Sequence, residues 1–91
     1  MRDKEIRDQK LYIARSYIKQ VLDAFTEAKD VKITLFDYNF DADQLNIEMT
    51  RKWAKYVVSF DAETLLNYSP AVITKSIIHD AKQHLRIQEE K

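Results

Sequence analysis

The sequence contains no glycine in 91 residues, although average usage would place about six in a chain of this length. Glycine takes positive φ without steric cost and lets a backbone approach a phosphate closely. Its absence excludes a P-loop, a dinucleotide-binding fingerprint, a nucleophile elbow and a kinase-type phosphate loop. We therefore expect no nucleotide-dependent catalysis. Turns should be longer than two residues or should use Asn and Asp.

The overall composition is that of an ordinary globular protein, with 45% apolar residues and 15 basic residues balanced by 15 acidic ones. The length predicts a single domain over residues 1–91. There is no cysteine, which excludes disulfides and Cys-ligated zinc. No apolar run reaches the roughly 20 residues that a membrane span needs, and the charged N-terminus does not resemble a secretion signal. We expect a cytoplasmic protein that binds neither a membrane nor a cofactor.

Residues 5–29 are predicted to form one long amphipathic helix. Apolar residues recur at spacings of three and four, namely Leu11, Ala14, Ile18, Val21, Phe25 and Ala28. A second row, formed by Ile6, Ile13, Tyr17 and Ala24, widens the apolar face. A wide face packing on a sheet is the simpler interpretation. We also expect Ile6, Ile13 and Tyr17 to mediate self-association with a second copy of the chain.

The middle of the chain alternates apolar and polar residues, which predicts strands at 31–35, 44–50 and 55–60. Phe36, Tyr38 and Phe40 have the opposite parity to Val31, Ile33 and Leu35, so either a bulge shifts the register or these rings lie on the other face. Asp61 is a predicted N-cap for a short helix over 62–66, and Ser69-Pro70 opens a final helix over 71–88. The expected fold is α+β. A three-stranded antiparallel meander in the order α-β-β-β-α carries its helices on one face of the sheet.

Double-stranded-RNA-binding domains share this α-β-β-β-α order, but the residues do not support that family. Its last helix would begin with a cluster of basic residues that grips phosphates. Here the corresponding segment is SPAVITKS, in which Lys75 is the single basic residue.

The segment DYNFDADQLNIE, residues 37–48, resembles an EF-hand calcium loop. Oxygen-bearing side chains occupy positions 1, 3, 5, 7 and 12, namely Asp37, Asn39, Asp41, Asp43 and Glu48. Position 6 is alanine rather than glycine, however, and the flanking elements are predicted strands rather than helices. We expect an acidic hairpin loop without a tight calcium site.

The segment from Arg51 to Tyr56 interleaves basic and aromatic residues, including Lys52, Trp53 and Lys55. Such a segment could bind single-stranded nucleic acid, with Phe36, Tyr38 and Phe40 completing an aromatic platform on the sheet. The neighbouring acidic loop would repel phosphate, however, and exposed rings also anchor protein interfaces. We expect Trp53 to be at least partly exposed, because its parity opposes that of Tyr56, Val58 and Phe60.

Other candidate chemistry is weak. His79 and His84 are five residues apart and diverge on a regular helix, so they do not form a metal pair. No serine has a sequence context that would activate it. The sequence therefore predicts a non-enzymatic protein-interaction or assembly module. Small accessory proteins of viruses and mobile elements have this character, as assembly subunits or as inhibitors of a host protein. The predicted partner-binding residues are Trp53, Arg51, Lys52, Lys55, Phe36 and Tyr38. The alternative function is nucleic-acid binding through residues 51–56.

Overall fold

A computed structural model describes residues 2–87, in which three helices accompany one three-stranded sheet. The elements follow in the order α1 (Arg2–Ala28), β1 (Lys32–Asn39), β2 (Gln44–Arg51), β3 (Ala54–Asp61), α2 (Ala62–Asn67) and α3 (Pro70–His84). This order confirms the predicted α+β class. Helix α3 ends at His84, earlier than the predicted Gln88, which lies outside the described residues.

The sheet has the strand order β1-β2-β3, and both pairings are antiparallel. A bulge between Ile33 and Leu35 shifts the register of β1. As a result Phe36 pairs with Ile47 and Tyr38 pairs with Leu45. Since directly opposed residues point to the same face, the bulge brings these rings onto the apolar face of β2. Of the two predicted alternatives, the bulge is the one that the structure adopts.

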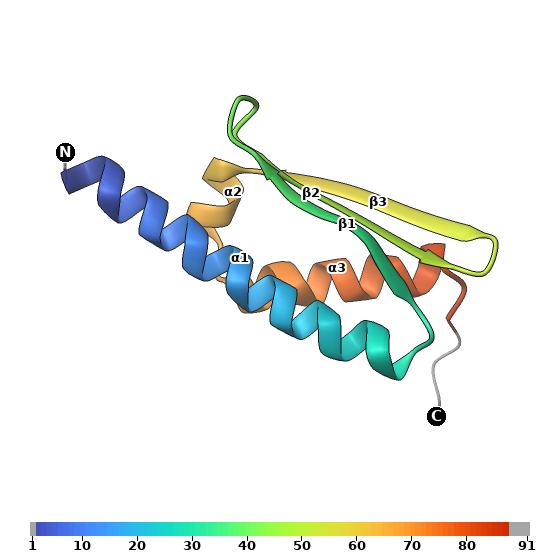
Figure 1. The fold of residues 1–91 in the computed structure, drawn as a ribbon. Helices are drawn as coiled ribbons and strands as arrows, with labels where there is room; N and C mark the ends of the chain where they lie inside the picture. The colour runs from blue at the N-terminus through green and yellow to red at the C-terminus, as the bar shows by residue number, and fades with distance from the viewer. Residues whose placement is uncertain (1, 88–91) are drawn as a thin grey trace.

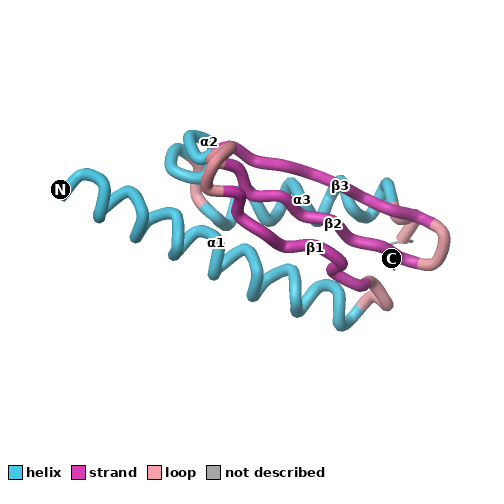
Figure 2. Tube along the Cα trace, turned by 45° about the horizontal axis from the view of Figure 1, so that its top comes forward, coloured by secondary structure: helices cyan, strands magenta, loops and turns pink. Residues whose placement is uncertain are grey.

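The molecule has two layers. Helices α1 and α3 run side by side beneath one face of the sheet, and the other face carries no helix of the described chain (Figures 1 and 2). The N-terminal turns of α1 extend beyond the end of the sheet (Figure 2). The predicted packing of the helices on one sheet face is confirmed.

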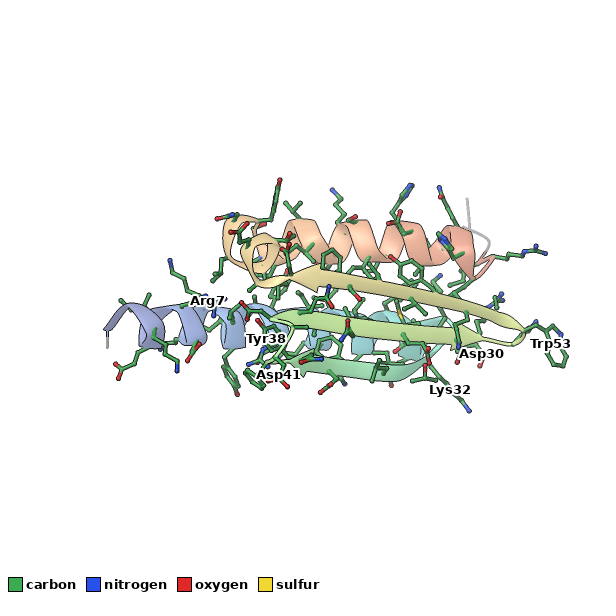
Figure 3. All side chains as sticks on the ribbon, turned by 90° about the horizontal axis from the view of Figure 1, so that it is seen from above. Arg7, Asp30, Lys32, Tyr38, Asp41 and Trp53 are labelled. Carbon is green, nitrogen blue, oxygen red and sulfur yellow. The ribbon has the colours of Figure 1, made fainter. Side chains whose placement is uncertain are left out.

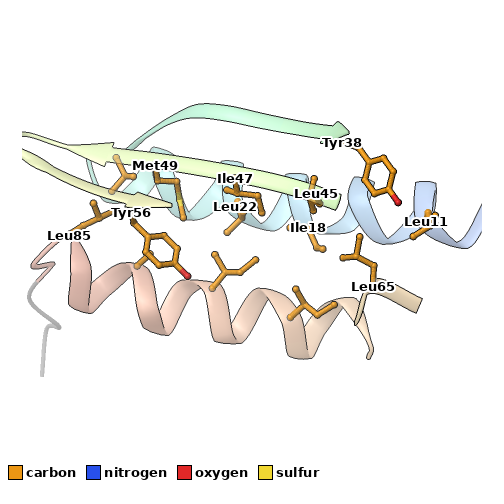
Figure 4. Packing of buried hydrophobic residues seen from close by; sticks show 14 of the residues in the cluster. Leu11, Ile18, Leu22, Tyr38, Leu45, Ile47, Met49, Tyr56, Leu65 and Leu85 are labelled. Atoms are coloured by element: carbon orange, nitrogen blue, oxygen red, sulfur yellow. The ribbon is translucent and has the colours of Figure 1, made fainter. Parts of the chain in front are cut away.

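The core lies between these layers and is centred on β2 (Figure 4). Leu45, Ile47 and Met49 are fully buried against Ile18 and Leu22 of α1. The predicted α1 row needs two corrections: Leu22 takes the central place assigned to Val21, and Ala28 is exposed. The helical period explains the first, because a four-residue step from Ile18 follows 3.6 residues per turn better than a three-residue step does at this point.

The two shorter helices begin at the predicted N-caps. The carboxylate of Asp61 accepts a hydrogen bond from the backbone N–H of Thr64 at 2.9 Å, and the hydroxyl of Ser69 accepts one from the N–H of Val72 at 3.2 Å. The bond from the Thr64 N–H lowers the pKa of Asp61. These side chains satisfy N–H groups that the first turn leaves without partners.

The ends of α1 and α3 show how the chain manages without glycine. Each closes with a Schellman-type bond, from the Val31 N–H to the Thr26 carbonyl at 3.2 Å and from the Ile87 N–H to the Lys82 carbonyl at 2.9 Å. Such a closure needs one residue with positive φ, normally glycine. Asp30 and Arg86 fill this position with φ of 56°.

The β2–β3 turn departs from the prediction. It is a two-residue turn, Lys52-Trp53, in which Lys52 has a φ of 55°. The expectation of longer turns or of Asn and Asp holds for the β1–β2 loop, where Asn39 accepts two backbone N–H bonds and Asp43 has positive φ. It is wrong for β2–β3, because the register pairs Arg51 directly with Ala54 and leaves only two residues for the connection.

Candidate binding surface at the hairpin tip

Trp53 stands at the tip of the β2–β3 hairpin, projecting from one end of the molecule (Figure 3). Its side chain is 100% exposed, which confirms the predicted exposure. The two-residue turn accounts for this position, because no strand or helix of residues 2–87 lies beyond it. A fully exposed indole places a large apolar area in water, and that area is available to a partner.

Arg51 has a structural role that its sequence context did not reveal. Its guanidinium donates hydrogen bonds to the carbonyls of Leu85 at 3.2 Å and Arg86 at 3.3 Å. These carbonyls lie at the end of α3, where a positive charge also interacts favourably with the helix dipole. Arg51 therefore ties the hairpin to α3, and we call it the hairpin clamp.

The predicted basic residues at the tip differ in their engagement. The Lys55 ammonium forms an ion pair with Glu48 at 3.4 Å, whereas Lys52 is exposed next to Trp53. A shallow hollow of about 460 Å³ lies here, lined by both lysines and by His84 and Arg86 of the C-terminal segment. Sequence reasoning missed His84 and Arg86, because no local signal shows that a segment more than 30 residues away folds against this turn. Together Lys52, Trp53, Lys55, His84 and Arg86 form a surface that we call the basic tip.

The acidic β1–β2 loop lies at the opposite end of the sheet. Antiparallel strands connect at alternate ends, so the β1–β2 loop with Asp41 and the β2–β3 turn with Trp53 are separated by the length of β2 (Figure 3). Eight residues of strand span about 26 Å. Screening in physiological salt acts over about 8 Å. The predicted repulsion of an anionic partner by the acidic loop is therefore weak at the basic tip.

Phe36 and Tyr38 lie away from the basic tip. Tyr38 is buried in the core, where its hydroxyl donates a 2.5 Å hydrogen bond to Asp43, and Arg7 of α1 pairs with the same carboxylate. Burial, together with this bond, raises the pKa of Tyr38 to about 12. Phe36 is half-buried on the same side of the sheet. Tyr38 is thus removed from the predicted contact surface, because the bulge in β1 turns its ring toward the helices.

The open face of the sheet consequently has no aromatic platform within the described residues. Its apolar side chains are Leu35 and Val57, which flank Glu48 across the strands. A surface for stacking several bases would need more than one exposed ring. The basic tip offers the single indole of Trp53.

The oxygen atoms of residues 37–48 do not converge as in a calcium loop. Asn39 bonds the backbone of its own turn, Asp43 bonds Arg7 and Tyr38, and Glu48 lies in mid-strand bonded to Thr34 and Lys55. The positive φ falls on Asp43 rather than on the sixth loop position. Over residues 2–87, no group of three or more His, Cys, Asp or Glu side chains is placed to hold a metal ion.

The predicted self-association residues Ile6, Ile13 and Tyr17 are exposed on α1. Ile13 borders a hollow of about 320 Å³ whose other walls include Tyr68, itself exposed, at the junction of α2 and α3. The sequence pattern of α1 alone indicated the row on that helix. It gave no signal that Tyr68 lines this hollow together with Ile13.

No helix in the described part of the chain is both long and apolar enough to cross a membrane. A scan against protein-family models found no match, and searches of curated proteins and of solved structures found none either.

Proposed function

We propose that this protein is a non-enzymatic protein-binding module that presents the basic tip to its partner, with Trp53 as the anchor. The observation that carries this proposal is the complete exposure of the Trp53 side chain on a two-residue turn. Tryptophan is among the residues most enriched at energetic centres of protein interfaces. An indole that is fully exposed in its own chain gains the most from entering a pocket on another molecule.

The surroundings of Trp53 define the chemistry of the partner. Lys52 and Arg86 are exposed beside it, and Lys55 adds a third cation to the hollow. A complementary surface therefore has an apolar pocket with carboxylates around its rim. Such a module would act in the cytoplasm as an assembly subunit or as an inhibitor of a larger protein.

Nucleic-acid binding through residues 51–56 is the alternative. The cations of the basic tip and their distance from the acidic loop favour it, whereas the single exposed ring does not. The two functions respond differently to salt. Burial of the Trp53 ring is insensitive to salt, and contacts of the tip cations with carboxylates weaken moderately as salt rises. Phosphate contacts weaken steeply as salt rises.

The experiment is affinity capture from cells that express the protein, with mass-spectrometric identification of what is bound. We compare the wild type with Trp53→Ala and with Tyr68→Ala, which removes another exposed ring outside the basic tip. We expect a protein that the wild type and Tyr68→Ala retain and Trp53→Ala loses. Equal retention by all three proteins would contradict the proposal. Salt-sensitive binding to an oligo-dT probe that requires Lys52 and Arg86 would assign the nucleic-acid function instead.

A further inference from the structure

A hollow of about 480 Å³ opens between α1 and β1, and it shares no lining residue with the basic tip. Its walls are largely aromatic, formed by Tyr12 of α1, by Phe36 and Tyr38 of β1 and by Phe40 just after that strand. We call it the aromatic hollow. Tyr12 is 64% exposed and Phe40 is 76% exposed, so both rings are accessible from solvent. Pockets of about 300–1,000 Å³ accommodate small ligands, and these rings favour a planar, apolar one.

Arg15 lines the aromatic hollow without an anionic partner. It is half-buried, and its Cζ carbon lies 4.8 Å from the centre of the Tyr38 ring and 5.7 Å from that of the Phe40 ring. Its Nε donates to the Leu11 carbonyl at 3.3 Å, whereas its two terminal nitrogens make no hydrogen bond or ion pair among residues 2–87. A guanidinium held over rings keeps the N–H donors along its edge for a planar acceptor. A partly desolvated, unpaired cation of this kind gains much from an anion.

The other charged residues that line the aromatic hollow supply neither the missing anion nor a second unpaired cation. The Lys19 ammonium pairs with both carboxylate oxygens of Asp23, at 2.8 and 2.9 Å. Asp37 lines the hollow as well, but it alternates along β1 with Phe36 and Tyr38, so its side chain leaves the strand on the opposite side. The side of the hollow that the rings enclose therefore presents one unpaired positive charge. That charge matches a single carboxylate better than a phosphate group with two negative charges.

We infer that the aromatic hollow binds a small aromatic carboxylate. The carboxylate accepts two parallel hydrogen bonds from the terminal nitrogens of Arg15, and the ring of the ligand enters between Tyr12 and Phe40. The inference is independent of the proposed function, because it uses a different surface from the basic tip. The protein would then carry a site for a small ligand in addition to a surface for a protein partner.

The test is an amide NMR titration of the full chain with 2-naphthoate, a planar aromatic carboxylate. The dissociation constant should be about 1 mM or tighter, as expected for a ligand with about a dozen non-hydrogen atoms. The shifts should concentrate at Tyr12, Arg15 and Phe40 and should leave the indole N–H of Trp53 unmoved. Two matched compounds separate the contributions. 2-Naphthalenemethanol keeps the rings without the charge, cyclohexanecarboxylate keeps the charge without the aromatic rings, and each should bind at least about fivefold more weakly.

Variants of the chain test the same two contributions. Arg15→Gln should weaken the binding of 2-naphthoate by about tenfold or more, and Tyr12→Ala should weaken it by at least about fivefold. Arg15→Lys keeps the charge but lacks the planar fork, so it should not restore the wild-type affinity. Lys52→Gln is the control, since it also removes one positive charge but at the basic tip, and it should bind as the wild type does. Tyr12 is exposed, so Tyr12→Ala should fold and keeps the test decisive if Arg15→Gln does not.

The inference is overturned if 2-naphthoate causes no shift at several millimolar, or if it binds no better than 2-naphthalenemethanol. Binding that Lys52→Gln loses while Arg15→Gln and Tyr12→Ala keep it would also overturn the inference, because it would place the ligand at the basic tip. Tighter binding of 2-naphthyl phosphate than of 2-naphthoate would overturn the assignment to a carboxylate. None of these results bears on the capture of a protein through Trp53, so the proposed function is tested separately.

Discussion

Replacing Arg86 with glycine should stabilise the fold. Arg86 has a φ of 56° at the closure of α3, and its side chain makes no hydrogen bond or ion pair among the described residues. The left-handed conformation costs a residue with a Cβ about 1–2 kcal/mol. Glycine removes that cost, but it also gains freedom in the unfolded chain, which offsets about 0.4–1 kcal/mol. The net gain is about 0.5–1 kcal/mol, which raises Tm by roughly 2–8 °C for a domain of this size.

The assay is thermal and urea unfolding followed by circular dichroism. Arg86→Ala provides the reference, because alanine removes the same side chain and keeps the Cβ. At Lys75, an exposed position inside α3, the order should reverse, and alanine should be more stable than glycine by about 1 kcal/mol. If Arg86→Gly is no more stable than Arg86→Ala while Lys75 behaves as expected, the backbone argument for this closure is refuted.

The remaining predictions concern pH, self-association and calcium. Burial, and secondarily the charge of Asp80, raises the pKa of Tyr56 to about 12, so the folded state favours the protonated phenol. The resulting stabilisation of the fold is complete below pH 10 and is lost as pH rises toward 12. Tyr56→Phe should therefore flatten that part of a plot of unfolding free energy against pH. Ile13→Asp should leave the domain folded, because Ile13 is exposed, and should lower the mass of any assembly that forms through α1; an unchanged mass by light scattering would exclude that face. Calorimetric titration of calcium should give no binding in the micromolar range, because the Asp43 and Glu48 carboxylates are bonded elsewhere, and tight binding would contradict the observed geometry.

Local patterns predicted the parts of the fold that depend on local interactions. Asp61 and Ser69 were identifiable as N-caps because a cap bonds N–H groups within three residues. The exposure of Trp53 followed from its parity against the neighbouring strand residues. The bulge in β1 was indicated by the change of parity at Phe36, although the pattern alone did not decide between a bulge and a change of face.

The parts that the sequence did not predict depend on contacts between distant segments. Arg51 was grouped with the partner-binding residues because it precedes Lys52 and Trp53, and only the approach of α3 shows that it bonds the Leu85 carbonyl. The distance between the acidic β1–β2 loop and the basic tip arises from the order of strand connections. The hollow that Tyr12 of α1 lines together with Phe36 and Phe40 requires the packing of α1 against β1, which periodicity in either element does not specify.

The hairpin clamp has a consequence for the way Trp53 meets a partner. A two-residue turn on a free hairpin would sample many orientations, and binding would have to freeze them at an entropic cost. Because Arg51 joins the base of the turn to the carbonyls of Leu85 and Arg86, the indole is carried on a preorganised support. The same bonds connect the tip to the C-terminal end of α3, where the Leu85 N–H donates to the Ala81 carbonyl at 2.8 Å. A partner that binds Trp53 should therefore slow amide hydrogen exchange at Leu85. Binding at the hairpin would then be detected as slower hydrogen exchange at the end of α3.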